Sequence, residues 1–166
     1  MTSATQQFLE YFDREHQTTL RVLRAYPANQ LDLKPHAKCK TARELAWFFT
    51  MEQAILEKAM TTGLQWSPPP PPFPPAPASM EAIITAFDEG HHRVAEIVRG
   101  MSDQQLQGTV KFPVAPKTLG DIPKLQFLWM LLSDQIHHRG QFSIYLRMAD
   151  GKVPSIYGPT ADEPWF

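Results

Sequence analysis

The sequence has very little cysteine, with Cys39 as the single example among 166 residues. An internal disulfide is therefore excluded, and so is a zinc site built from clustered cysteines. The neighbouring residues Lys38 and Lys40 would favour the thiolate form of Cys39. A lone thiol without a role is the simpler interpretation, and we adopt it here.

Blocks of like charge and long apolar runs are also missing. Sixteen basic residues stand against seventeen acidic ones, dispersed along the chain, and the formal net charge is −1. The electrostatic footprint of a nucleic-acid-binding protein is therefore absent. The longest near-apolar run, Phe127 to Leu132, is too short to cross a bilayer, and the N-terminus lacks the pattern of a signal peptide. We expect a cytoplasmic protein that binds neither nucleic acid nor membrane.

Sequence signatures of common catalytic sites are absent as well: there is no nucleophile elbow, phosphate-binding loop or dinucleotide-binding fingerprint. The sequence therefore names no reaction. With 43% apolar residues, the chain can bury one substantial core, so we expect residues 1–166 to form a single domain.

Apolar residues recur at helical spacing in four segments, approximately residues 4–25, 41–62, 80–99 and 120–148. Four long helices and little else predict an all-α fold, a four-helix bundle. Residues 108–118 are expected to be irregular, and residues 152–166 to form a loop that packs back on the bundle through Ile156, Tyr157 and Trp165.

Local signals mark where the helices begin. Thr41 and Glu44 have the spacing of a capping box, and Ser79 stands where the third helix begins. We expect Asp121 to cap the fourth helix, with Pro123 in its first turn.

A proline-rich segment joins the second and third helices. Residues 67–78 contain eight prolines, which exclude a helix or the interior of a sheet and favour polyproline II. We interpret this segment as a stiff crossover within the bundle. A ligand for SH3-like modules is the alternative.

The first half of the fourth helix is apolar on nearly all sides, from Leu125 to Leu132. Such a helix is buried on most sides, so it lies either in the centre of the bundle or in a dimer interface.

The candidate chemistry lies further along the same helix. Asp134 and His138 are four residues apart, on one face of the helix, in a stripe with Leu131 and Tyr145. We expect both to point inward. A buried carboxylate requires a partner or a metal ion. The two side chains could hold a divalent metal, or they could be hydrogen-bonded to each other or to Arg139.

A metal site needs at least one ligand from another helix, because only two are visible here. The candidates are His16, Glu52 and His91. Glu52 lies on the apolar side of the second helix, four residues after Phe48, and His91 follows Phe87 by four. A lone histidine near an apolar stripe is more often a core residue than a ligand.

The chain resembles the DinB-like superfamily of metal-dependent four-helix-bundle proteins. Three stretches carry the resemblance: Leu33-Lys34-Pro35-His36 leading into residues 41–47, His137-His138-Arg139-Gly140-Gln141 with residues 145–147, and residues 153–159 with 161–163. Together they cover nearly the whole chain, so the resemblance implies a single DinB-like domain over residues 1–166. It also implies a homodimer and a small-molecule substrate, because homodimers are common in this family and some relatives are transferases or isomerases that use low-molecular-weight thiols.

The resemblance also implies a metal site of three histidines, two of them four residues apart on the fourth helix. Carried over to this sequence, the later one is His138, the earlier position holds Asp134, and the second-helix position holds Phe48. The third ligand would then be lost unless the metal shifts toward Glu52. We therefore expect a remodelled or degraded site of unassigned reaction that binds zinc or nickel weakly or not at all. The alternatives are a non-catalytic bundle that binds or dimerises, and a metal- and thiol-dependent transferase or isomerase.

Overall fold

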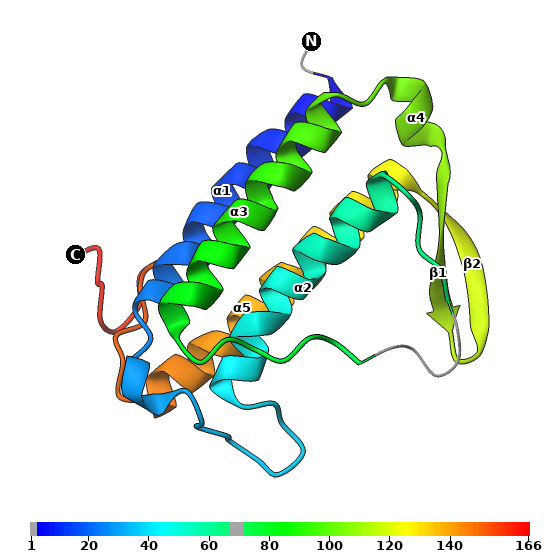
Figure 1. The fold of residues 1–166 in the computed structure, drawn as a ribbon. Coiled ribbons are helices and arrows are strands. Elements are labelled where there is room, and N and C mark those ends of the chain that lie inside the picture. Colours follow the sequence, from blue (N-terminus) through cyan, green and yellow to red (C-terminus); the bar gives the residue numbers. More distant parts are fainter. Residues whose placement is uncertain (1–2, 67–71) are drawn as a thin grey trace.

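The structure is a computed structural model that describes residues 3–66 and 72–166 (Figure 1). It is mostly helical, with one small antiparallel sheet. The elements in chain order are α1 (Ala4–Arg24), the 3-10 turn η1 (Ala28–Gln30), α2 (Ala42–Met60), α3 (Met80–Arg99), α4 (Asp103–Gln107), β1 (Thr109–Ala115), β2 (Thr118–Pro123) and α5 (Lys124–Met148).

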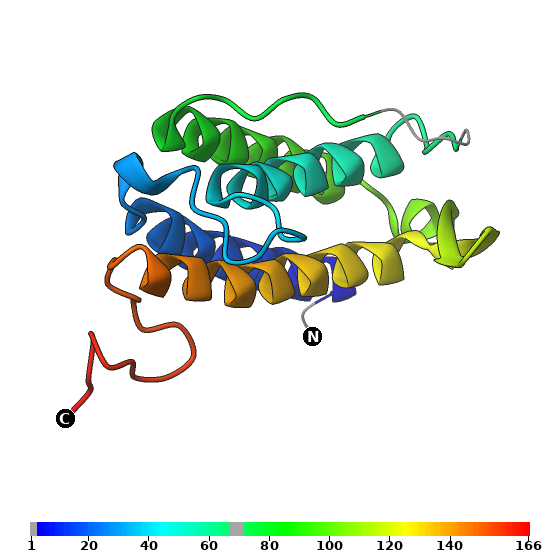
Figure 2. The ribbon, with the colours of Figure 1, turned by 90° about the horizontal axis from the view of Figure 1, so that it is seen from below.

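The four long helices pack side by side along their lengths (Figures 1 and 2). α1 contacts α3 and α5, and α2 contacts the same two helices. α2 and α3 run in the same direction, so the chain between them must return along the length of the structure before α3 begins. No helix in the described ranges is long and apolar enough to cross a membrane.

Side-chain caps begin three of these helices, and the caps of α2 and α3 are those that the sequence predicts. Thr41 and Glu44 form the reciprocal capping box at the start of α2. The Ser79 hydroxyl accepts a hydrogen bond from the Ala82 amide at the start of α3, and Ser3 caps α1 in the same way. Because these signals are local, the starts of α2 and α3 follow directly from the sequence.

The all-α prediction is wrong for residues 109–123, which form a β-hairpin that projects beyond the helices (Figure 1). Val110 pairs with Ile122 and both are buried, while Lys111 pairs with Asp121 on the exposed side. Asp121 is therefore a strand residue rather than a helix cap, and α5 begins only after Pro123. The physical reason is that a residue before proline avoids the helical conformation, so Ile122 is extended.

The described part of the proline-rich crossover, residues 72–78, has neither helix nor strand, as predicted. Residues 67–71 of the predicted crossover lie outside the described residues. The Trp47 indole donates a 2.9 Å hydrogen bond to the Pro74 carbonyl, and Phe73 packs edge-on against Phe48. The segment is thus held against α2.

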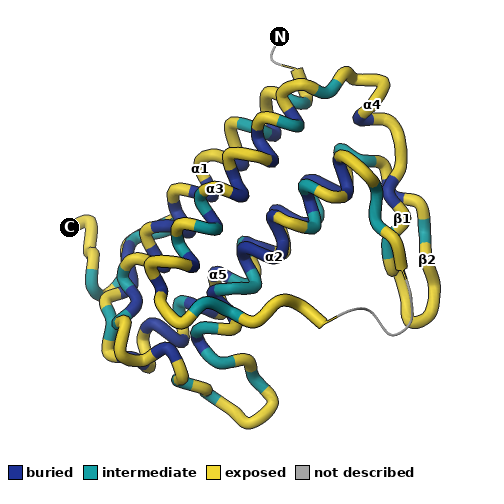
Figure 3. Tube along the Cα trace, viewed as in Figure 1, coloured by how far each residue is buried: buried dark blue, intermediate teal, exposed yellow. Residues whose placement is uncertain are grey.

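The core consists of two apolar clusters separated by a polar layer. Buried residues lie on the faces that the helices turn toward one another (Figure 3). One cluster holds the C-terminal parts of α1 and α5 with the N-terminal parts of α2 and α3, and the other holds the opposite ends of these helices. Between them lie the buried polar side chains, and we call this set the polar layer: Glu15, His16, Thr18, Thr19, Thr50, Glu52, Gln53, His91, Gln135 and Arg139.

Candidate metal centre

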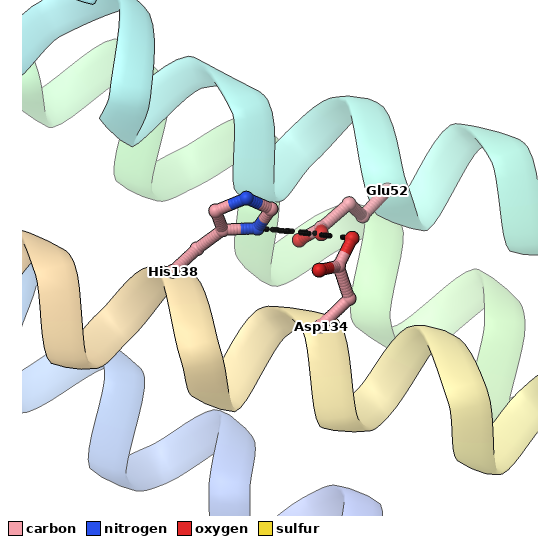
Figure 4. Close-up of side chains that lie close together, drawn as sticks. All are labelled: Glu52, Asp134 and His138. Carbon is pink, nitrogen blue, oxygen red and sulfur yellow. Dashed lines mark hydrogen bonds and ion pairs between the residues drawn. The ribbon is translucent and has the colours of Figure 1, made fainter. Parts of the chain in front are cut away.

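Three potential metal ligands converge at the edge of the polar layer, between α2 and α5 (Figure 4). Glu52 comes from α2, and Asp134 and His138 come from successive turns of α5. One ligand atom from each lies within 4.8 Å of the others. The structure therefore brings together the three residues that the sequence indicates as candidate ligands.

The three side chains differ strongly in burial. The Glu52 side chain is 1% exposed, that of His138 17% and that of Asp134 49%. His138 Nδ1 lies 3.0 Å from Glu52 Oε1 and 4.0 Å from Asp134 Oδ2. The centre thus has a buried side on α2 and an open side at Asp134, from which an ion or a small molecule can approach.

Burial also sets the protonation of the centre. Burial, reinforced by the nearby Asp134 carboxylate, raises the pKa of Glu52 to about 10. Burial lowers the pKa of His138, against the opposing effect of Asp134. Glu52 is therefore protonated and His138 neutral at pH 7, and their contact is a neutral hydrogen bond rather than an ion pair. A divalent cation would have to displace the Glu52 proton, so its binding would release a proton.

The donor set fits a divalent metal. Glu52 Oε2 is buried and has no hydrogen-bond partner among the described residues, and such an oxygen is costly unless something coordinates it. One imidazole nitrogen and two carboxylates are ligands that zinc accepts, with room for a water or a substrate in a fourth position. Compared with a three-histidine site, this set is richer in oxygen, which also suits manganese.

Phe48 lies directly beside the centre, at the position where the family resemblance implies a histidine. Its ring packs edge-on against the His138 ring, with centroids 4.9 Å apart. An aromatic ring cannot ligate a metal, so the second-helix ligand is displaced by one turn, from Phe48 to Glu52.

The other candidate third ligands lie elsewhere. His16 and His91 are buried in the polar layer between α1 and α3, where their Nε2 atoms contact Asp88 and Asp13. Neither belongs to the group of potential ligands around Asp134. Their buried positions are those of core histidines.

The predicted inward stripe of α5 is confirmed at Leu131 and Tyr145, which are buried, but only in part at the two candidate ligands. His138 does face α2, but Asp134 is half-exposed, and the most deeply buried positions of this stretch are Gln135 and Arg139. Arg139 Nη2 lies 2.7 Å from Glu15 Oε2 and 2.6 Å from the Tyr157 hydroxyl. Arg139 therefore pairs with an acid of α1 rather than with Asp134.

The surroundings of the centre include residues that the sequence left without a role. Lys38, Cys39 and Lys40, in the loop before α2, line a groove that reaches His138. Their spacing in the sequence gives no hint of this, because the path of an irregular loop depends on tertiary contacts. One such contact is the 2.9 Å hydrogen bond that the Tyr145 hydroxyl donates to the Lys40 carbonyl.

Comparisons with known proteins agree with this architecture. The model of the DinB family matches residues 1–164 of the chain. Protein YrdA of Bacillus subtilis (strain 168), itself uncharacterized, is 25% identical over 158 residues, which cover 94% of this chain and 89% of YrdA.

Two solved structures share the fold. A DinB-like protein from Bacillus cereus ATCC 10987 matches with a TM-score of 0.73 and 24% identity, over 90% of this chain and 95% of that one. The DinB-like protein YjoA of Bacillus subtilis matches with a TM-score of 0.67 and 13% identity, over 89% of this chain and 95% of that one.

Proposed function

The chain belongs to the DinB family, and from this premise we propose that it binds one divalent metal ion through Glu52, Asp134 and His138. The observation that carries the proposal is the convergence of these three ligand groups within 4.8 Å, with a buried and unpartnered Glu52 oxygen among them. The four long helices act as a four-helix-bundle scaffold that fixes Glu52 on α2 opposite the pair on α5.

The proposed centre is a remodelled family site rather than a lost one. Two ligands from one helix would chelate weakly, but Glu52 adds a ligand from a second helix and a second carboxylate charge. With three protein ligands, a fourth position stays open for water or substrate, as in catalytic zinc sites. When bound there, the metal would supply a Lewis acid able to polarise a substrate or activate a water.

The chain's own residues give the centre an asymmetric access route. Phe48 covers the His138 ring on one side, and the half-exposed Asp134 leaves the other side open. A substrate therefore approaches along the surface of α5. The proposal specifies no reaction class. If the protein bound no metal, a non-catalytic bundle that dimerises would be the better interpretation.

Metal titration tests the proposal. Untagged protein is stripped with a chelator and titrated calorimetrically with zinc, nickel or manganese chloride, and we expect one ion per chain for at least one metal. Glu52→Gln and His138→Gln should each weaken binding at least tenfold.

The matched control is His137→Gln, which removes the neighbouring exposed histidine and should leave the affinity unchanged. Binding that is absent, or that depends on His137 as strongly as on His138, would overturn the proposal.

A further inference from the structure

Two grooves flank the proposed centre along the same face of α5. The first, which we call the cationic groove, has a volume of about 470 Å³ and is lined in part by Lys38, Lys40, Phe48, His138, Ile144 and Tyr145. The second, the apolar groove, has a volume of about 450 Å³ and is lined by Phe112, Met130, Leu131, Ser133, Asp134 and His137. Each groove includes one α5 ligand, so the centre lies where the two meet.

Two lysines give the cationic groove its positive charge, and Glu44, which interacts with Lys40, lies outside its lining. No carboxylate lines it, and in residues 3–66 and 72–166 neither Lys38 nor Lys40 forms an ion pair. The Lys40 ammonium lies 5.2 Å from the centre of the Phe48 ring, which in turn packs against His138. Two ammonium groups that form no ion pair, at one end of a groove, favour an anionic group there.

The apolar groove has the opposite character. Phe112, Met130 and Leu131 form an apolar wall, beside which lie Ser133 and His137. Asp134, at the end shared with the centre, is the one carboxyl group of the lining. Phe112 is held in place by edge-on packing against Phe127 and Trp66, with centroids 5.0 and 5.3 Å apart. A fixed apolar wall gains free energy by covering an apolar group of a ligand.

The distance between the grooves sets the size of what fits. The α5 residues of the apolar groove are centred near position 133 and those of the cationic groove near position 142. At the rise of an α-helix this separation is about 13 Å. It corresponds to the length of a medium-chain fatty acid.

We propose that the substrate class is an amphipathic monoanion whose anionic head lies between Lys38 and Lys40 and whose apolar chain lies against Phe112, Met130 and Leu131. The middle of such a molecule crosses Asp134 and His138. The inference deepens the proposed function and rests on it for the statement that the bound molecule is a substrate; the binding itself depends on the grooves alone.

Octanoate, 1-octanol and acetate serve as probes, titrated calorimetrically into chelator-treated protein. Octanoate should bind at least tenfold more tightly than either of the others, because it alone has both the charge and the chain. The double variant Lys38→Met/Lys40→Met keeps the aliphatic stems and should weaken octanoate binding at least tenfold, while leaving 1-octanol binding unchanged. Met130→Gln should weaken the binding of both.

The control is Lys58→Met, which removes an exposed charge of α2 outside both grooves and should have no effect. Octanoate binding no tighter than that of 1-octanol or acetate, or unaffected by the double lysine variant, would overturn the inference. A repeat with zinc-loaded protein separates the two proposals. If only the metal proposal is wrong, the protein binds no zinc but still binds octanoate. If octanoate binding requires zinc and is unchanged in the double lysine variant, the carboxylate binds the metal, which contradicts the assigned orientation.

Discussion

His16 and His91 stack face to face in the polar layer, with ring centroids 3.8 Å apart and ring planes within 6° of parallel. Each ring reaches across to an aspartate of the other helix: His16 Nε2 lies 2.7 Å from Asp88 Oδ1, and His91 Nε2 lies 2.8 Å from Asp13 Oδ1. The contacts of α1 and α3 are thus reciprocal at this point.

The same five-residue pattern, Phe-Asp-x-x-His, produces both halves of this contact. It occurs at residues 12–16 in α1 and at residues 87–91 in α3. Each phenylalanine also packs on the histidine of the opposite helix, Phe12 on His91 and Phe87 on His16. Two antiparallel helices with one motif therefore form a locally symmetric crossing.

The first prediction concerns acid stability and His91. Burial lowers the pKa of His91 to about 4, whereas the same group titrates near 6.5 in the unfolded chain. The unfolded state therefore binds more protons between these values, so the stability that neutral His91 contributes is present above pH 6.5 and lost as the pH falls toward 4. One such proton changes the free energy of unfolding by up to about 1.4 kcal/mol per pH unit.

The variant His91→Gln should flatten the decline of the unfolding free energy between pH 6.5 and pH 4, as measured by urea denaturation. His92→Gln is the matched control, because the His92 side chain is exposed. Equal slopes in the wild type and His91→Gln would show that His91 does not titrate as stated.

The second prediction concerns Glu52 in the metal-free protein. Because its pKa is raised to about 10, the folded state binds more protons than the unfolded state from about pH 4.5 upward. The stability associated with this proton is complete below that pH and is lost as the pH rises toward 10. Glu52→Gln removes the titration, so its advantage over the wild type should grow between pH 5 and pH 8, by about 1 kcal/mol or more.

The measurement is urea denaturation with a chelator present, and Glu96→Gln, an exposed glutamate of α3, is the control. A difference in unfolding free energy between Glu52→Gln and the wild type that stays constant across this pH range would contradict the raised pKa. If Glu52→Gln is more stable than the wild type but binds metal poorly in the titration, Glu52 has a functional rather than a structural role.

The third prediction restores the missing histidine. Phe48→His places an imidazole beside His138 and should tighten zinc binding at least tenfold by adding a fourth protein ligand. Phe48 is half-buried, so the fold should persist by circular dichroism. Trp47→His adds a histidine one position away, beside the crossover rather than the centre, and zinc calorimetry should show no gain for it. A gain of equal size in both variants would indicate nonspecific binding.

The fourth prediction concerns the buried Arg139–Glu15 pair, whose side chains are 1% and 2% exposed. Arg139→Met leaves the Glu15 carboxylate buried without its partner, and we expect a loss of about 3–5 kcal/mol. The double variant Glu15→Met/Arg139→Met should recover most of that loss, because no unpaired charge remains.

Urea denaturation measures each variant. Arg147→Met is the comparison for a solvent-accessible pair, here with Asp162, and should cost much less than the loss of Arg139. A double variant as unstable as Arg139→Met alone would show that packing, rather than the unpaired charge, causes the loss.

The sequence predicted the starts of α2 and α3 and the three converging ligands for related reasons. A capping box such as Thr41 with Glu44 is local, and the step from Phe48 to Glu52 is one helical turn, so neither depends on how distant segments pack. The four long helices follow from periodicity in the same way.

The errors arose where tertiary packing decides. α5 is apolar on nearly all sides in its first half, so no single face of it is favoured, and its rotation is set by its neighbours. Arg139 is therefore more deeply buried than Asp134, and Glu15, which looks like a surface residue of α1, is buried with it. The hairpin is not apparent from the sequence because the helical pattern of residues 124–148 continues back to about residue 120, whereas Pro123 keeps Ile122 extended.

The polar layer also restricts how the helices can slide along one another. In a purely apolar core, a shift of one helix by a turn, about 5.4 Å, replaces one apolar side-chain contact with another. Here the same shift of α1 against α3 would break both His–Asp contacts at once, and a shift of α1 against α5 would part Glu15 from Arg139. Each of these misaligned arrangements leaves buried polar side chains without their partners, so the polar layer favours a single axial alignment and holds Glu52 level with Asp134 and His138.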